Sequence, residues 1–455
     1  MASTYLTRTN SGTGSTTAAT VSMWVKFCDP TSSQHLWIHY YDNSNFLRLT
    51  YESDSCLKIQ ADISNSTVLN KKTTRVFRDT MGWYHIQLAI NLADSTAEDK
   101  YKLYINGERE TVFQTNTNSS ATSGSYVGGS SNWNPTFGRH PSGSSYFNGL
   151  MSHVHFCDGS ALAPTVFGST DSVTGEWNIN TSPSFTPGTN GYSILKDGNT
   201  VTDSSANSNN FTVGGGSLTF THDCPSNILS TINRNAGNWV NLSNGALKSV
   251  NPNGQTLNYN PVYFSNLGYS AGKFYWETKV SSFSTGSGHS VSLMRTNTGH
   301  IPSYGTDSTS DGTSIGNNTI NYFFAENTTY FKKYGTNEQS GSVGSTLSSG
   351  DIVGMSHDVS AGEVKYFVNG SQIGSTITGV SSANDGYTYI PYWFQETKQS
   401  SRYCTMEWNM GNGFFGTTAI STNSGNGYAG AEGKSKFNYQ PASGFCAVST
   451  KGLNT

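Results

Sequence analysis

The chain has 455 residues, of which only 12% are charged, and its formal net charge is −3. Its 26 basic and 29 acidic residues are not clustered, so nucleic-acid binding lacks the basic footprint that phosphate contacts require. No run of about 18 apolar residues appears, so no membrane insertion is expected. The first residues do not form a signal peptide, so we expect export by lysis or inside an assembly.

The first half alternates apolar and polar residues with the period of β-strands and shows no sustained helical period. Residues Trp83–Arg109 are expected to form a hairpin, and Asn116–Ser131 an exposed loop rich in Ser, Gly and Asn. Prolines interrupt Ala163–Thr200, where Gly175–Trp177 is expected to anchor a covering loop. Further strands are predicted at Val21–Phe27, Gln34–Tyr41, Phe46–Tyr51, Cys56–Ile63, Thr136–Arg139, Tyr146–Phe156 and Phe211–Val213.

The second half shows the same alternation of apolar and polar residues. Lys273–Val280 alternates most clearly, with Phe274, Trp276 and Thr278 on one face of the predicted strand. The final segment, Phe437–Leu453, is expected to pack back on a sheet. Other strands are predicted within Leu242–Lys248, Val291–Arg295, Ile320–Phe324, Thr329–Tyr334, Asp351–Gly374, Tyr387–Phe394 and Cys404–Trp408.

One arrangement occurs in both halves. An alternating strand and a polar turn precede a second strand that ends in Asn-Gly, at Asn106-Gly107 and again at Asn369-Gly370. Asn-Gly between alternating hydrophobic residues is a strong hairpin signal, because both residues tolerate positive φ. The sequence therefore predicts an all-β chain of two related antiparallel sandwiches in tandem. The expected divisions are residues 1–222, residues 223–412 and a C-terminal segment, 413–455, that packs on the second domain.

Specific segments resemble known families. The first half resembles a laminin-G/concanavalin-A-like jelly roll in SMWVKF, GWYHIQLAI, YKLYINGE and FNGLMSHVHFCDGSALAP. The second half resembles a SPRY domain, also a concanavalin-A-like sandwich, in GKFYWETKV, GDIVGMSHD and VKYFVNG. Their order, with DSSANSNNFT and DCPSN between them and FNYQPASGFCAVSTKGL after them, is similar to tandem laminin-G–SPRY structural proteins of tailed bacteriophages.

That resemblance implies a non-enzymatic protein on the outer surface of a phage virion. The preferred expectation is a tail-fibre-like adhesin that contacts other virion proteins and a host glycan or protein, as a homo-oligomer and preferably a trimer. A capsid decoration protein that clamps the head lattice is the alternative. The chain begins almost directly in the predicted sandwich, without the shaft of a complete fibre, which keeps that alternative open.

A glycan-degrading enzyme of the same fold is a third alternative, and it would need two neighbouring carboxylates. Glu108 and Glu110 share a face but are expected at a solvated strand end, and Glu277 and Glu407 are expected to point outward from their sheets. Gly268–Gly272 matches Gly-x-Ser-x-Gly, yet a strand is predicted after it, whereas a nucleophile elbow needs a helix there. We therefore predict no catalytic residues.

Metal sites were sought among His, Cys and Asp. His153, His155 and Cys157 alternate on one predicted strand and could bind zinc, but no fourth ligand is evident beyond the adjacent Asp158. The preferred interpretation is that Val154 and Phe156 point inward and the histidines outward. No metal or cofactor is assigned, although calcium is left open, with loop candidates Asp42, Asp94 and Asp203.

The six cysteines are not at metal-finger spacing and include no Cys-x-x-Cys. Six reduced thiols are predicted, several of them buried, with one disulfide as the alternative.

Glycan or partner binding is assigned to aromatic and polar residues of predicted loops. Sugar sites stack a ring on an aromatic face and hold hydroxyls with amides or arginine. The stretch Ser131–His140 is the most lectin-like, and the loops of the second half supply analogous aromatics. The candidates are Trp133, Asn134, Arg139, Tyr146, Tyr304, Tyr334 and Trp393.

Overall fold

The computed structural model divides into two compact units, Met1–Thr219 and Phe220–Thr455, each of which is described by itself. The first unit thus ends three residues before the predicted division at residue 222. The described residues are 3–454 apart from 11, 30, 119–131, 197–199, 234–241, 252–260, 285–287, 298–317, 325–328, 335, 340–342, 345, 396–401 and 422–426. Within them no helix is long and apolar enough to cross a membrane.

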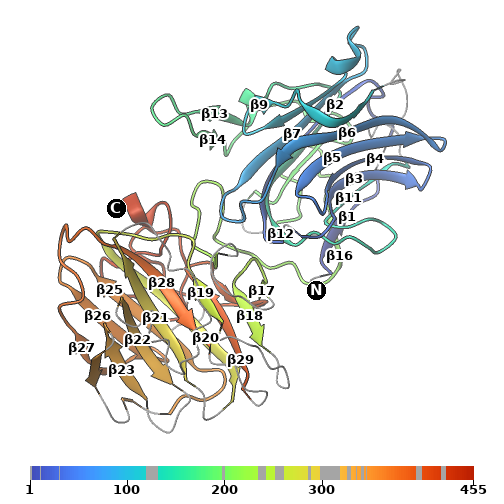
Figure 1. The fold of residues 1–455 in the computed structure, drawn as a ribbon. Helices are drawn as coiled ribbons and strands as arrows, with labels where there is room; N and C mark the ends of the chain where they lie inside the picture. Colours follow the sequence, from blue (N-terminus) through green and yellow to red (C-terminus); the bar gives the residue numbers. More distant parts are fainter. Residues whose placement is uncertain are drawn as a thin grey trace. The chain divides into compact units, whose positions relative to one another are not determined.

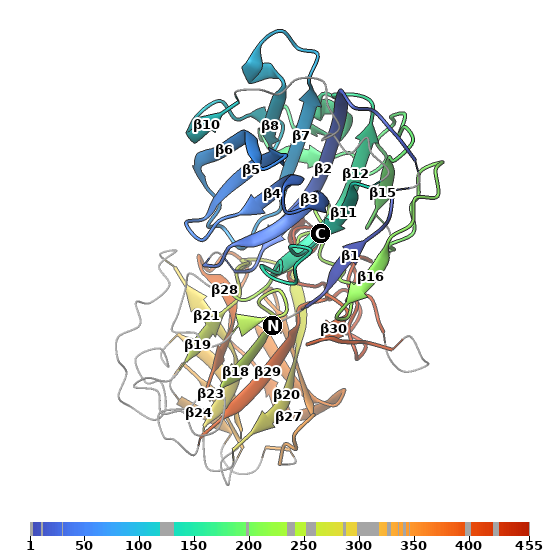
Figure 2. The same ribbon diagram turned by 90° about the vertical axis from the view of Figure 1, so that its right-hand side faces the viewer.

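Unit 1 is a sandwich of two antiparallel sheets (Figure 1). The eight-stranded sheet has the order β10 (Phe113–Thr117), β6 (Ser66–Val76), β5 (Cys56–Ile63), β4 (Asn45–Tyr51), β3 (Gln34–Asp42), β11 (Asn134–Phe137), β1 (Tyr5–Thr7) and β16 (Thr212–Gly215). The six-stranded sheet has the order β15 (Tyr192–Ile194), β12 (Gly149–Asp158), β2 (Ala18–Phe27), β7 (Tyr84–Asn91), β8 (Tyr101–Ile105) and β9 (Glu108–Arg109). Figure 2 shows β1 running beside β16 at one edge of the larger sheet.

The core of unit 1 lies between these sheets because alternate residues of each strand face inward. In β2 the inward residues include Met23 and Val25, and in β4 they include Leu47 and Leu49, all of them fully buried. Val154 and Phe156 of β12 also join this core, as predicted.

The outer face of the six-stranded sheet is covered too. The segment after β12 contains a 3₁₀ turn, η3 (Pro164–Val166), and a small hairpin of β13 (Gly168–Thr170) and β14 (Trp177–Ile179). Trp177 donates its indole N–H to Nδ1 of His85 in β7 at 3.1 Å and stacks on that ring. The covering loop predicted around Gly175–Trp177 is therefore present, and it leaves His85 fully buried.

Unit 2 is a second antiparallel sandwich. Its seven-stranded sheet has the order β17 (Leu242–Ser243), β18 (Lys248–Asn251), β29 (Cys404–Asn409), β20 (Lys273–Phe283), β25 (Ile352–Asp358), β26 (Glu363–Val368) and β27 (Ser371–Ile377). Its six-stranded sheet has the order β19 (Val262–Phe264), β28 (Thr388–Phe394), β21 (His289–Thr296), β22 (Thr319–Phe324), β23 (Tyr330–Lys333) and β24 (Thr336–Gln339). The other elements are the two-stranded β30 (Phe414–Phe415) and β31 (Thr418–Ala419), and the 3₁₀ turn η4 (Gly452–Asn454).

The C-terminal segment covers the outer face of the seven-stranded sheet. Cys446 pairs with the start of β20, where its carbonyl accepts the N–H of Tyr275 at 2.9 Å. Phe437 packs edge-on against the Tyr275 ring at 5.0 Å. Phe274 and Trp276 face the core on the other side of β20, as the alternation predicts.

The repeated Asn-Gly hairpin is confirmed in both units. Asn106 and Asn369 both have a φ of 49°, and the glycines that follow them have φ of 80° and 82°. Each asparagine also accepts, through Oδ1, the backbone N–H of the strand that opens its motif, from His85 at 2.8 Å and from Ile352 at 3.0 Å. The same local chemistry therefore builds one corner of each sandwich.

Most predicted strands are present, but β6 was missed. Its sequence, STVLNKKTTRV, has a central Lys-Lys that breaks the expected alternation. Lys71 points inward there, only 2% exposed, because its ammonium group pairs with Glu98 at 2.9 Å. None of the six cysteines forms a disulfide in the described part of the chain, in line with the prediction of reduced thiols.

Candidate functional site

Six side chains on the eight-stranded sheet of unit 1 form the candidate site, which we call the Arg139 site. They come from β1, from β3 and from the turn that follows β11. They are Tyr5, His35, Tyr40, Arg139, His140 and Tyr146.

Strand register directs these side chains away from the core. Residue Thr136 of β11 pairs with Ile38, and Ile38 pairs with Arg48 of β4, so these three share the outer face. The alternate residues Trp37 and Leu49 lie in the core. Tyr40 lies two residues after Ile38 in β3, so its side chain points to the same outer face.

Gly138 makes the turn into the site. It has a φ of +83°, a region that disfavours side chains, and a Cβ there would lie 3.2 Å from the carbonyl oxygen of Thr4. The chain then returns through a bridge between His140 and Ser144. This geometry places Arg139 across Tyr5, with its guanidinium carbon 3.4 Å from the centre of the ring.

Aromatic rings surround the arginine and the adjacent histidine. The Nη1 group of Arg139 lies 3.5 Å from the hydroxyl of Tyr146. His140 meets the ring of Tyr40 at 5.7 Å and that of His35 at 5.0 Å, both edge-on. A cationic fork, three tyrosine faces and two imidazoles therefore lie together.

Both histidines of the site are uncharged at neutral pH. Burial, with the charges of Arg48 and His140, lowers the pKa of His35 to about 3. Burial, with the charges of Arg48 and Arg139, also lowers the pKa of His140. His35 is buried, with only 7% of its surface exposed, and neither of its ring nitrogens has a hydrogen-bond partner.

Arg139 and Tyr146 of the predicted candidates belong to this site, and Asn134 lies beside it. Asn134 pairs with Tyr40 across β11 and β3 and accepts the N–H of Asn10 through Oδ1 at 3.1 Å. The other members, Tyr5, His35, Tyr40 and His140, were missed. The alternation of β3 would have placed Tyr40 on the outer face, but only the partner register shows which face that is.

Two predicted aromatic candidates were wrong. Trp133 is 4% exposed and belongs to the core of unit 1, because it begins the approach to β11 from inside the sandwich. Trp393 is fully buried in β28 and donates its indole N–H to Thr278 at 2.8 Å. Neither ring can stack on a ligand. Tyr304 lies outside the described residues.

Tyr334 is partly exposed in unit 2 and lies against an arginine. The guanidinium carbon of Arg295 is 3.5 Å from the centre of the Tyr334 ring and 4.6 Å from that of Tyr387. The hydroxyl of Tyr334 donates to the carbonyl of Val380. This second arginine–tyrosine group belongs to unit 2 and is separate from the Arg139 site.

The glutamates considered for catalysis are held by other contacts. Glu277 and Glu407 lie on the strand faces opposite the core, as predicted, but they are only 0% and 7% exposed because these outer faces are covered. The C-terminal segment covers Glu277, and Lys248 pairs with Glu407 at 2.6 Å. Glu110 was also predicted to be solvated, but it is 8% exposed and pairs with Arg75 at 2.7 Å. Ser270, in the Gly-x-Ser-x-Gly match, precedes strand β20 and not a helix.

The His-x-His-x-Cys segment of β12 makes separate contacts. His153 contacts Ser152 at 2.7 Å, His155 contacts Ser193 at 2.9 Å, and the Cys157 thiol lies 3.2 Å from the carbonyl of Thr186. His155 points to the outer face, as predicted, but it is only 3% exposed because Phe167 and Phe185 of the covering segment pack on it. In the described part of the chain, no three His, Cys, Asp or Glu side chains are grouped to hold a metal ion.

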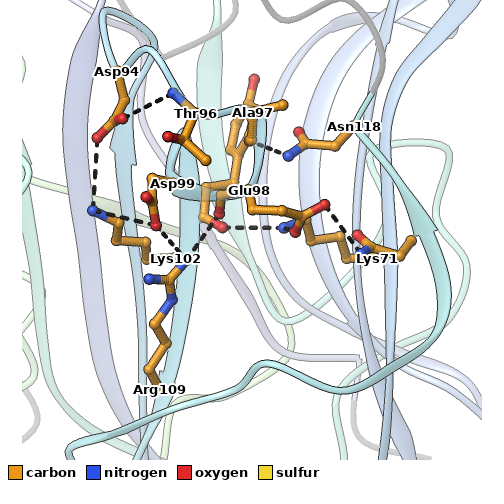
Figure 3. Close-up of polar contacts among 11 residues, drawn as sticks. Lys71, Asp94, Thr96, Ala97, Glu98, Asp99, Lys102, Arg109 and Asn118 are labelled. Carbon is orange, nitrogen blue, oxygen red and sulfur yellow. Dashed lines mark hydrogen bonds and ion pairs between the residues drawn. The ribbon is translucent and has the colours of Figure 1, made fainter.

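Two calcium candidates are turn residues. Asp42 accepts the N–H of Ser44 at 2.8 Å. Figure 3 shows Asp94 in a polar cluster around η1 (Ala97–Asp99), where its carboxylate accepts the N–H of Thr96. Lys102 lies 3.8 Å from both Asp94 and Asp99, and Arg109 pairs with Asp99 at 2.6 Å. Beside Asp94, cations therefore occupy the positions that a calcium ion would need.

The third calcium candidate, Asp203, organises the DSSANSNNFT segment. Its carboxylate accepts the N–H groups of Ser193, Ser205 and Asn209 at 2.7–2.8 Å, and the Ser205 hydroxyl at 2.7 Å. Asn209 then accepts the guanidinium of buried Arg8 at 2.6 Å. This network ties the end of unit 1 to its first strand.

Replacing Asp203 with alanine is expected to destabilise unit 1 by on the order of 3 kcal/mol, because several buried donors lose their acceptor. Urea unfolding followed by unit-resolved hydrogen exchange measures the change. Asp171→Ala is the matched control, because Asp171 also accepts two turn N–H groups but is only partly buried, so little change is expected. Equal effects of the two substitutions would contradict the role assigned to Asp203.

Part of the first unit matches a known family model. Residues 1–166 match the sequence profile of the laminin-G family Laminin_G_3, described as concanavalin A-like lectin/glucanases superfamily. The fold is concanavalin A-like. The predicted fold class, all-β with tandem antiparallel sandwiches of this kind, is therefore confirmed. No curated protein sequence matches the chain.

Solved structures similar to the chain include SPRY domains. That of human HERC1 is 13% identical, with a TM-score of 0.30, over 39% of this chain and 96% of its own. The TRIM65 PSpry domain is 14% identical, with a TM-score of 0.29, over 40% of this chain and 88% of its own. Domain 4 of AbnA, an arabinanase from Geobacillus stearothermophilus solved with arabinotriose, is 19% identical, with a TM-score of 0.28, over 35% of this chain and 68% of its own.

Proposed function

We propose that this chain is a non-enzymatic surface protein of a tailed-phage virion, tail-fibre-like in role, that binds a glycan of the host surface through the Arg139 site. The observation that carries the binding proposal is the stacking of Arg139 on Tyr5 beside the hydroxyl of Tyr146. The virion proposal is supported by the order of the laminin-G-like and SPRY-like segments described above.

The chemistry of the site suits a sugar better than an apolar ligand. Sugar rings offer a C–H face that packs on aromatic rings and hydroxyls that need both donors and acceptors. Tyr5, Tyr40 and Tyr146 offer the rings and hydroxyls, while the neutral imidazoles of His35 and His140 offer nitrogens of either kind. Lectin-like binding is also consistent with the concanavalin A-like fold of unit 1.

A binding measurement on the whole protein tests this proposal. Purified polysaccharide from the host envelope is immobilised, and association is followed by interferometry. Arg139→Ala is expected to weaken binding at least about tenfold, since charge-assisted hydrogen bonds and stacking are lost together. Arg109→Ala, which removes an arginine of the same unit paired with Asp99, is the control and should bind as the unaltered protein does.

Absence of binding by the unaltered protein would overturn the glycan proposal, and shortened polysaccharide chains after incubation would overturn the non-enzymatic one. The place on the particle is tested by counting copies in purified virions by quantitative mass spectrometry. A few copies per virion support a tail fibre, many copies support a capsid decoration protein, and none contradicts a virion protein.

A further inference from the structure

We infer that the glycan bound at the Arg139 site carries an acid group, such as the carboxylate of a uronic acid. This inference rests on the proposed function and names the class of sugar. It follows from two arginines that form no ion pair in the described part of the chain, together with a buried imidazole that has no partner.

The first observation is that Arg139 and Arg48 form no ion pair within the described residues. Arg139 contacts only neutral groups, the ring of Tyr5 and the hydroxyl of Tyr146, and its Nε atom is buried without a partner. Arg48 lies 4.7 Å over the ring of Phe46 and donates to the amide of Gln60 at 2.8 Å, and its Nε atom is also buried without a partner.

Two other arginines of unit 1 form ion pairs, whereas buried Arg8 is held by the neutral amides of Asn10 and Asn209. Arg75 pairs with Glu110 at 2.7 Å, and Arg109 pairs with Asp99 at 2.6 Å. A guanidinium presents a planar fork that matches a carboxylate, and a stacked guanidinium keeps that fork available at its edge.

The second observation is that both arginines act on the same histidine. The charges of Arg48 and Arg139 each lower the pKa of His140. The charge of Arg48 also lowers the pKa of His35. The ring centres of His35 and His140 are 5.0 Å apart. A ligand acid group would neutralise the charge of Arg139 beside the histidine pair, whereas the charge of Arg48 is already partly offset by Glu52 and Asp62.

His35 supplies the third observation. Its two nitrogens are buried without a partner, a state that costs free energy unless a ligand or water completes it. A neutral imidazole can donate to a ring oxygen or hydroxyl beside the carboxylate without adding charge. The site therefore combines an acid-binding fork with a neutral donor and flat aromatic faces.

Oligogalacturonate and its methyl ester provide a direct test, because the two probes have the same sugar rings and differ only in charge. Binding of the full-length protein to each is measured by calorimetry in EDTA, at low and at high salt. We expect the acid form to bind at least about tenfold more tightly than the ester, and the difference to shrink as salt rises. R139Q and R48Q should each reduce that preference, while R109Q should leave it unchanged.

The outcomes separate this inference from the proposed function. If the ester binds as well as the acid, or if R139Q keeps the full preference for the acid, the inference is wrong and the proposed glycan site remains. If neither probe binds, the acid inference fails for uronates. If host polysaccharide also fails to bind, the proposed function fails with it. Circular dichroism of each variant confirms that a loss of preference is not a loss of fold.

Discussion

Acidification from pH 7 to pH 4 is expected to unfold unit 1 before unit 2. Burial is the largest cause that lowers the pKa of each of six histidines to about 3, well below the ordinary 6.5. Four of them lie in unit 1 and two in unit 2. They are His35, His39, His85 and His155, and then His289 and His357.

Whether acid lowers or raises the stability depends on whether the folded or the unfolded state binds more protons. The folded chain keeps these rings neutral, whereas the unfolded chain protonates them near pH 6.5. Their contribution to stability is therefore complete above pH 6.5 and is lost as the pH falls toward 3. Each pKa unit corresponds to about 1.4 kcal/mol, so by pH 4 the loss from four histidines is comparable with the total stability of a typical domain.

Hydrogen exchange of the whole protein at stepped pH measures the two units separately. His39→Leu is the most informative variant, because both nitrogens of His39 are buried without a partner and its ring packs on Trp37 and Phe156. The substitution removes a titrating group without removing a hydrogen bond, so it should lower the acid midpoint of unit 1. Earlier unfolding of unit 2, or an unchanged midpoint in the variant, would contradict this account.

The sequence predicted the sandwiches well, because the strands depend on local alternation and the corners on Asn-Gly. Strand β5 has the predicted bounds, Cys56–Ile63, and both Asn-Gly turns have the expected positive φ. Alternation also assigned the inward residues of β12 and β20 correctly.

Alternation does not show whether the second face of a sheet meets water. In this chain a loop covers one outer face and the C-terminal segment covers another, so His155 and Glu277 are buried although they were predicted to face outward. Alternation also could not predict which strands meet at the Arg139 site. Arg139 and Tyr146 are near each other in sequence and were predicted, whereas Tyr5 and Tyr40 join them only through the strand order around β11.

Loss of the Glu277 carboxylate is expected to destabilise unit 2 by several kcal/mol. The carboxylate accepts the backbone N–H groups of Asn438 and Tyr439, each at 2.8 Å, the amide of Asn409 at 2.9 Å and the hydroxyl of Tyr275 at 3.2 Å. Glu277→Ala leaves these buried donors without an acceptor, at a cost of about 1–3 kcal/mol for each unsatisfied group. The C-terminal segment should then detach from β20, and amide exchange around Asn438 should rise first.

Two further variants separate hydrogen bonding from charge. Glu277→Gln keeps the volume and one acceptor oxygen, so its loss of stability should be smaller than that of Glu277→Ala. Glu363→Gln, in an exposed pair with Lys365 at 3.1 Å, should change stability by less than about 1 kcal/mol. Similar stabilities for Glu277→Ala and Glu363→Gln would show that the carboxylate does not hold the segment.

The pH dependence of the same variants gives an independent check. Burial raises the pKa of Glu277 to about 7, so the folded state holds this proton more tightly than the unfolded chain, whose value is 4.5. The contribution of Glu277 to stability is therefore greatest below pH 4.5 and decreases as the pH rises to 7, opposite to that of the histidines. Glu277→Gln removes this slope, so the free energy of unfolding of unit 2 should vary less between pH 5 and pH 7 than it does in the unaltered protein. If the free energy of unfolding of Glu277→Gln still varies with pH as in the unaltered protein, another group titrates in this range. Glu277 would then stabilise unit 2 only through its four hydrogen bonds.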